Sequence, residues 1–157
     1  MVWQYVIGGA LVGAAVLLDS DEDHHDVVQQ TVNNLEPELP EHASLYADHL
    51  GDGYPNPRGA FTGIDNAPED HIPDVVVTSG IKNNLIIEVE TGDSIEESSS
   101  AAKSQIDDFS IPGYRRALVV PDADFDAVHV DEFEEHLDEE IDGQFYVATP
   151  SGVTDLL

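Results

Sequence analysis

Residues 73–90, PDVVVTSGIKNNLIIEVE, contain two apolar runs separated by a short polar segment. The β-branched run after Asp74 and the run from Leu85 to Glu90 predict two strands, and the Gly and Asn residues between them predict a turn. In such a hairpin, Asp74 at the start of the first strand and Glu88 and Glu90 at the end of the second come together in a small volume. Three neighbouring carboxylates repel one another unless a cation lies between them. The hairpin therefore predicts a site for a hard divalent cation.

The charge of the chain indicates the solvent in which it folds. There are 33 acidic residues against 5 Lys and Arg in 157 residues, which gives a formal net charge of -28. Repulsion of this size opposes a compact fold at low ionic strength, whereas molar salt screens charges beyond about 3 Å. The composition is typical of proteins from extreme halophiles, and the 41% of hydrophobic residues favours a folded domain over a disordered acidic chain. Because Cys is absent, thiol chemistry, disulfides and Cys-ligated zinc are excluded.

The first 40 residues divide into an apolar and an acidic segment. Residues 3–18, WQYVIGGALVGAAVLL, form an uncharged run that as a helix would be about 24 Å long, near the lower limit for crossing a membrane. We expect residues 1–19 to be an apolar helix that anchors the chain in a membrane; a buried or partner-packed helix and a cleaved leader are the alternatives. Residues 20–40 predict an acidic linker with a weak helix from Val27 to Leu35. The expected location is a membrane surface or the cytoplasm of a high-salt cell.

The remaining segments indicate one α/β domain over residues 41–157. Some of these segments contain apolar residues at helical spacing, which predicts helices. Other segments are short β-branched or apolar runs bounded by Gly and Pro, which predicts strands. Apart from the hairpin, the expected elements in chain order are a helix within 41–50, a short strand at 60–64, a helix over 92–109, a buried strand over 116–121, an acidic helix over 130–141 and a strand over 144–148.

The order αβββαβ, with residues 60–64 as the first strand, combines with the dipeptide Pro73-Asp74 and the tripeptide EVE at 88–90. This combination resembles the PD-(D/E)xK nuclease superfamily over about residues 41–153. The resemblance implies a restriction-endonuclease-like fold, with a mixed sheet flanked by helices, and metal-dependent hydrolysis of DNA.

The resemblance also assigns roles to residues of the hairpin. By position, Asp74, Glu88 and the backbone carbonyl of Val89 are implied as ligands of Mg²⁺ or Mn²⁺. The third motif position, usually Lys in the superfamily, is Glu90 in this chain. Either Glu90 itself handles the attacking water, or the Lys has moved to the following helix as Lys103; the alternative for Lys103 is an exposed surface residue. If neither holds, the domain is a catalytically inactive binding or structural module.

Five further residues are candidates near this site. Gln105 matches a Gln that the superfamily often has on the same helix, and Glu41 is a candidate for an extra acidic ligand from the first helix. His71 lies just ahead of the hairpin and is a candidate to support the site from outside the ligand set. Arg115 and Arg116 open a buried strand, where they meet either a phosphate or nearby carboxylates.

The cation content limits the expected partners. Phosphate backbones are bound mainly by Lys and Arg, of which the chain has five, so DNA binding is expected to rest on bound metal, hydrogen bonds and shape. The spacing of Gly9 and Gly13 would let two apolar helices approach closely, which makes a homo-oligomer and a membrane the other expected partners. His24 and His25 lie among acidic residues and could bind a metal loosely, but we interpret them as part of a solvated linker.

Overall fold

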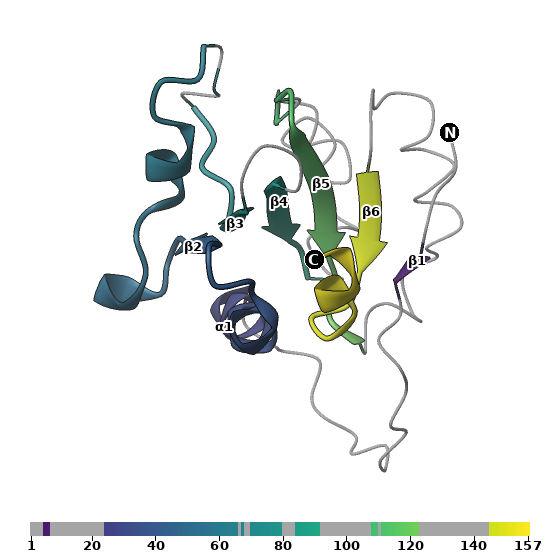
Figure 1. Ribbon diagram of the computed structural model, residues 1–157. Helices are drawn as coiled ribbons and strands as arrows, with labels where there is room; N and C mark the ends of the chain where they lie inside the picture. The colour runs from purple at the N-terminus through teal and green to yellow at the C-terminus, as the bar shows by residue number, and fades with distance from the viewer. Residues whose placement is uncertain are drawn as a thin grey trace.

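The computed structural model describes residues 24–65, 67, 70–79, 84–91, 108–109, 111–122 and 145–157, together with a short strand at Tyr5–Val6. This part of the chain has an α/β architecture in which one α-helix packs on a mixed β-sheet (Figure 1). The helices are α1 His24–Leu35 and the 3-10 helices η1 Glu36–Glu38, η2 Gly51–Gly53, η3 Pro57–Phe61 and η4 Gly152–Leu156. The strands are β1 Tyr5–Val6, β2 Ser44–Ala47, β3 Val75–Thr78, β4 Asn84–Val89, β5 Tyr114–Val119 and β6 Phe145–Ala148.

The sheet combines an antiparallel half with a parallel half. Its described strands lie in the order β1-β6-β5-β4-β3-β2. β2, β3 and β4 pair antiparallel, whereas β4, β5, β6 and β1 pair parallel. The predicted hairpin, the buried strand after it and the last strand are all confirmed, with bounds shifted by one or two residues. The αβ class of the prediction is therefore correct.

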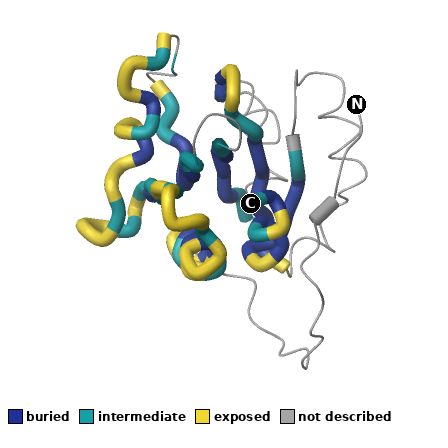
Figure 2. Tube along the Cα trace, in the orientation of Figure 1, coloured by how far each residue is buried: buried dark blue, intermediate teal, exposed yellow. Residues whose placement is uncertain are grey.

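Alternate residues of each strand pack on opposite faces of the sheet. Figure 2 shows that β3, β4 and β5 are buried along most of their length, as expected for strands covered on both faces. One face packs against α1 and η4, and Val75 and Ile87 belong to it. Val76 and Ile86 belong to the other face, where they pack with Phe61 of η3.

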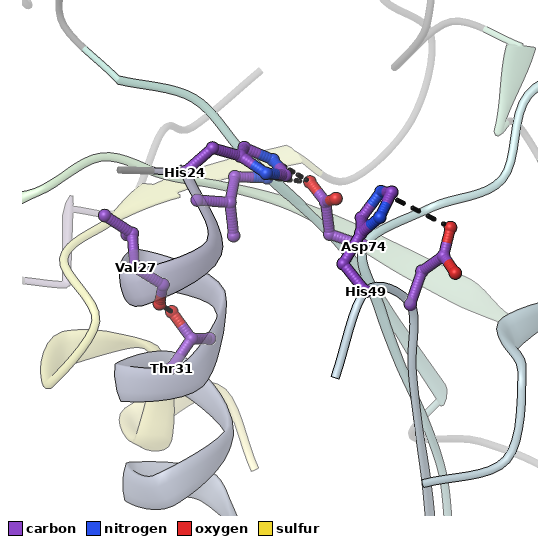
Figure 3. Close-up of polar contacts among 7 residues, drawn as sticks. His24, Val27, Thr31, His49 and Asp74 are labelled. Carbon is purple, nitrogen blue, oxygen red and sulfur yellow. Dashed lines mark hydrogen bonds and ion pairs between the residues drawn. The ribbon is translucent and has the colours of Figure 1, made fainter. Parts of the chain in front are cut away.

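Helix α1 confirms the predicted helix from Val27 to Leu35, but this helix is a core element and not part of an acidic linker. It begins at His24, about one turn earlier than expected, and its apolar side chains at helical spacing pack on the sheet. The one polar residue in the buried stripe, Thr31, donates its Oγ1 hydrogen to the carbonyl of Val27 at 2.8 Å (Figure 3). Its buried residues are Val27, Val28, Thr31, Val32 and Leu35. The folded domain thus includes residues well before position 41.

The predicted helix within residues 41–50 is also wrong, because this segment contains strand β2. Leu45 and Ala47 pack on the face of the sheet that carries α1, whereas Tyr46 packs on the opposite face. This alternation is that of a strand. The four residues of β2 pair with all four residues of β3. Pairing with a neighbouring strand decided the conformation of a segment whose apolar spacing fits a helix as well.

Residues 60–64 do not form the expected first strand. Ala60 and Phe61 end η3, which begins with Pro57 and is preceded by Asn56, whose side chain accepts a hydrogen bond from the Arg58 N–H. A proline in the first turn and an Asn cap favour a helical turn over a strand. Strand β2, and not residues 60–64, is the first strand in the order of elements.

At the amino terminus, the predicted apolar helix over residues 1–19 is wrong for Tyr5 and Val6. These two residues form β1, which pairs parallel with Val147 and Ala148 of β6. Aromatic and β-branched residues favour extended backbone, and β6 would otherwise leave a sheet edge there. The rest of that segment lies outside the described residues, and its membrane association stays a prediction. In the part of the chain that the structure describes, no helix is long and apolar enough to cross a membrane.

Two other predicted helices cannot be compared with the structure. Nearly all of the segment 92–109, and all of 130–141, lies outside the described residues. Of the first segment, Asp108 and Phe109 are described, and Phe109 is buried against the sheet face that carries Val76.

Candidate functional site

The register of the β3–β4 hairpin places two carboxyl groups side by side. Val75 is paired with Ile87, and one step further along both strands Asp74 comes opposite Glu88. Both residues are buried, with exposed fractions of 5% for Asp74 and 8% for Glu88. Glu88 therefore does not face solvent, although it lies in an apolar strand. A pair of buried carboxyls is costly unless protons, donors or cations compensate it.

The electrostatics of Glu88 reflect this proximity. Burial raises the pKa of Glu88 well above its usual value, and the charge of Asp74, a hydrogen bond with the Asp74 side chain and the charge of Glu90 raise it further. Glu90, the residue after β4, is thus close enough to act on Glu88 through its charge. At this end of the hairpin the charges of Asp74 and Glu90 both act on Glu88. The surroundings of these carboxyls favour a proton or another positive charge among them.

Asp74 also closes the end of the hairpin. Strand β3 begins one residue after Asp74, whereas β4 extends to Val89. The N–H of Val89 therefore lies beyond the end of β3. The Val89 N–H donates to Asp74 Oδ2 at 2.8 Å, and the Asp74 carbonyl accepts from the Asp48 N–H at 2.8 Å. Asp74 therefore ties three chain segments together: β4, the turn after β2 and, through a further contact, α1.

That further contact comes from His24, the first residue of α1. Its Nε2 lies 3.2 Å from Asp74 Oδ2 (Figure 3), and its side chain is 40% exposed. The hydrogen bond with Asp74 raises the pKa of His24 against the opposing effect of burial, helped by the charges of Asp74 and Glu90 and by a hydrogen bond with the Val89 backbone. The imidazole thus meets the same main-chain group that the resemblance implies as a metal ligand.

The interpretation of His24 as part of a solvated linker is therefore wrong. His24 lies four, seven and eleven residues before Val28, Thr31 and Leu35, which are all buried on one face of α1. The stripe of the helix continues back to His24 at helical spacing. This signal is present in the sequence, but the acidic residues around His24 conceal it.

A second histidine, His49, lies beside the first. Its ring is perpendicular to that of His24, with an interplanar angle of 79° and ring centroids 5.9 Å apart. Its Nε2 lies 3.5 Å from Asp48 Oδ2 (Figure 3). His49 has a φ of 64°, and among the described residues it is the one non-glycine with positive φ. Left-handed backbone is unfavourable for such a residue by about 1–2 kcal/mol.

The other predicted residues fall elsewhere or outside the described part of the chain. Glu41 is exposed in the turn before β2 and does not belong to a first helix. The Nδ1 of His71 lies 2.7 Å from Asp108 Oδ2, so His71 is paired with an acidic residue that is not part of the hairpin. Lys103 and Gln105 lie outside the described residues.

The first arginine of β5 contributes to the fold. The Arg115 guanidinium donates to the carbonyl of Leu156 in η4, which ties the carboxyl-terminal segment to the sheet. Arg116 is buried, with 3% exposure. The prediction for these arginines was contact with a phosphate or with nearby carboxylates. Arg115 instead contacts a backbone carbonyl.

The donors at the hairpin are of the kind that divalent cations take. Asp74 and Glu88 offer carboxylate oxygens, Val89 a backbone carbonyl and His24 an imidazole nitrogen, a combination used for Mn²⁺ and for later transition ions. As they stand, no three His, Asp or Glu side chains in the described ranges form a group that could hold an ion. The donor atoms are therefore of the types that bind a cation, but in this structure they form hydrogen bonds with one another.

Comparison of the chain with protein-family models, with curated proteins and with solved structures finds no match.

Proposed function

We propose that the chain is a metal-dependent, nuclease-like domain of the PD-(D/E)xK type that hydrolyses DNA phosphodiester bonds. The observation that carries the proposal is the pair of buried carboxyls, Asp74 and Glu88, opposite each other on neighbouring strands beside the main chain of Val89. A buried acidic pair in a hairpin is unfavourable for stability, which suggests that it is retained for binding or chemistry.

The order of elements supports the finer proposal of a restriction-endonuclease-like fold. Helix α1 is followed by β2, β3 and β4, which pair antiparallel in chain order, and then by β5, which is parallel to β4. A parallel pair needs a crossover connection, and the chain between β4 and β5 is long enough for one. With β2 as the first strand, the described elements match the α, the three β and the last β of the αβββαβ core that the resemblance implies, and the crossing helix of that core is proposed for the segment between β4 and β5.

In this proposal, Asp74, Glu88 and the Val89 carbonyl hold one Mg²⁺ or Mn²⁺ ion. Such an ion, when bound, supplies positive charge that polarises a phosphodiester and lowers the pKa of an attacking water. The hydrogen bond from the Val89 N–H fixes one oxygen of Asp74, and Glu88 approaches from the neighbouring strand. Glu90 acts on this site by its charge and is proposed to orient or deprotonate the nucleophile, either alone or with Lys103.

The test is cleavage of plasmid and branched DNA in molar KCl with Mg²⁺ or Mn²⁺. We expect the wild type to cut only with the metal present, and Glu88→Gln to lose cutting by at least about a hundredfold because a ligand is removed. Asp52→Asn, an exposed carboxylate in η2, is the matched control and should cut like the wild type. Equal cutting by wild type and Glu88→Gln would refute the site.

A second candidate is a catalytically inactive module of the same fold. It is favoured by Glu90 in the place of the customary Lys, and by His24, which already brings a hydrogen-bonding group to Asp74. Calorimetric titration with Mn²⁺ in molar KCl separates the candidates, since an inactive scaffold without a metal site shows no binding above that of Glu88→Gln.

A further inference from the structure

Beside the acidic pair of the hairpin, the described residues contain a pair of an acid and a base, His71 and Asp108. The Nδ1 of His71 lies 2.7 Å from Asp108 Oδ2, a length typical of a hydrogen bond between charged groups. Because an ionised carboxylate only accepts hydrogen bonds, Nδ1 donates and Asp108 fixes the orientation of the ring. This leaves Nε2 as the ring nitrogen that can exchange a proton with another molecule.

The pair contributes little to the stability of the fold. The His71 side chain is 37% exposed and that of Asp108 is 47% exposed. Exposed ion pairs are weak, and molar salt screens them further. The effect of the contact is therefore to hold the imidazole in one place at a surface that a substrate can reach.

That place is on the same side of the sheet as the acidic pair. The residue after Asp108, Phe109, packs on the face of the sheet that carries Val76. Side chains of a strand alternate between faces, so Asp74, two residues before Val76, belongs to this face as well. His71 precedes Asp74 by three residues, so their Cα atoms are at most about 11 Å apart. The pair of His71 and Asp108 therefore lies near the carboxyls of the hairpin without being one of them.

The proposed reaction has one step to which no residue has been assigned. When the bond between phosphorus and the leaving oxygen breaks, that oxygen needs a cation or a proton. Sites with two metal ions use the second ion for this purpose, whereas the proposed function places one ion at the hairpin, where it acts on the phosphate and the attacking water. The attacking and leaving oxygens are roughly in line across the phosphorus. A group that protonates the leaving oxygen must accordingly stand away from the metal ligands, as His71 does.

We propose that His71 is the general acid of the reaction and that Asp108 is its positioning residue. The inference rests on the proposed function, because it adds a step to the same reaction. The water oxygen bonds to phosphorus, and the electron pair of the broken bond stays with the leaving oxygen, which takes the proton of His71 Nε2. The proton lost by the water passes to Glu90 or to solvent, and solvent returns a proton to His71. Asp108 keeps a hydrogen on Nδ1 throughout.

The test compares DNA that needs an acid with DNA that does not. The bond that the wild type cuts in an oligonucleotide is first mapped in molar KCl with Mn²⁺, and the leaving oxygen of that bond is then replaced by sulfur. A thiolate leaves without a proton. We expect His71→Gln to cut normal DNA at least about a hundredfold more slowly than the wild type, and to cut the sulfur-containing DNA at the wild-type rate.

Two further variants complete the comparison. Asp108→Asn should show the same difference between the two substrates, because the amide of Asn can donate to Nδ1 and leave the ring in the wrong tautomer. His42→Gln changes an exposed histidine in the turn before β2, and as the matched control it should cut both substrates like the wild type. All three variants should keep the wild-type midpoint in chemical denaturation, since the residues concerned are exposed.

The outcomes distinguish this inference from the proposed function. If His71→Gln cuts normal DNA like the wild type, the pair is only a surface contact and the inference is overturned. Equal losses on the two substrates would also overturn it, because His71 would then act in binding or folding and not on the leaving oxygen. If the wild type cuts no DNA with Mn²⁺, or if Glu88→Gln cuts as fast as the wild type, the proposed function fails and the inference with it.

Discussion

The candidate site has an acidic half and a histidine half, and the two are built in different ways. The acidic half comes from one hairpin, in which Asp74 and Glu88 lie fourteen residues apart and meet through strand register. The histidine half comes from the start of α1 and the turn after β2, and His24 reaches Asp74 across fifty residues of chain. The first half depends on local pairing, whereas the second exists only once the helix has packed on the sheet. Changes to the two halves should therefore have different consequences.

The largest effect on stability is expected at Asp74, where the two halves meet. Asp74→Ala leaves the Val89 N–H without its acceptor in a buried position and removes the partner of His24. We expect it to lower the free energy of unfolding by about 2–3 kcal/mol. Asp74→Asn keeps an acceptor oxygen and removes a charge beside Glu88, so its loss should stay within about 1 kcal/mol. Chemical denaturation in molar KCl measures both values.

The comparison of these two variants separates hydrogen bonding from charge. If Asp74→Asn is as damaging as Asp74→Ala, the charge of Asp74 is what stabilises this end of the hairpin. In that case the description of Asp74 as a cap for the Val89 N–H is wrong.

An intermediate effect is expected in the dependence of stability on pH. The pKa values of Glu88 and His24 are both raised in the fold. The folded state therefore holds more protons than the unfolded state above the usual values of 4.5 for Glu88 and 6.5 for His24. Stability from these groups is present at lower pH and is lost as the pH rises through each window. Each unit by which a pKa is raised is equivalent to about 1.4 kcal/mol, reduced for the partly exposed His24 by solvent screening.

Glu88→Gln isolates the first of these windows. The variant cannot ionise, so we expect it to be more stable than the wild type above pH 4.5 and to lose the corresponding slope. Denaturation of both proteins at a series of pH values and constant salt gives the stability of the variant minus that of the wild type as a function of pH. The contributions of the many surface carboxylates cancel in this difference curve. A difference curve that falls with rising pH would mean that ionised Glu88 stabilises the fold, contrary to its buried position beside Asp74. Greater stability with lost metal binding is the pattern of a residue kept for function.

The sequence was sufficient for the acidic half of the site and for the strands around it. Two β-branched or apolar runs joined by Gly and Asn specify a hairpin, and a period of two then fixes which side chains lie opposite each other. Glu88 could be paired with Asp74 on that basis alone. The same local reasoning identified β5 and β6, which are short apolar runs whose partners lie on either side of them in the sheet.

The histidine half and the edges of the sheet could not be obtained in this way. Residues 44–47 have an apolar spacing that fits a helix or a strand, and only the free edge of β3 decides between them. The two residues of β1 are extended because β6, far along the chain, offers a partner. To predict the contact of His24 with Asp74, one has to know where the first turn of α1 lies against the hairpin. These features depend on contacts between distant segments, which a reading of local periodicity does not contain.

The smallest effect is expected at His49, and it probes how firmly the histidine half is held. His49→Ala keeps a side chain in left-handed backbone and loses the packing on His24, so we expect stability to fall by about 0.5–1 kcal/mol. His49→Gly loses the same packing but relieves the unfavourable backbone, which is worth about 1 kcal/mol or somewhat more, partly offset by the greater freedom of Gly in the unfolded chain. Of the two variants, His49→Gly should therefore be slightly more stable in chemical denaturation.

The ring of His24 gives the second measurement for the same pair. If His49 restricts that ring, both variants should weaken the hydrogen bond of His24 with Asp74 and lower the raised pKa of His24 by a similar amount, although their stabilities differ; NMR titration of His24 measures this pKa. Should the pKa of His24 instead follow stability, with His49→Gly closer to the wild type than His49→Ala, then the backbone conformation and not the aromatic contact controls the site. Because the two substitutions remove the same ring contact and differ in backbone strain, their comparison assigns the role of His49 to one cause or the other.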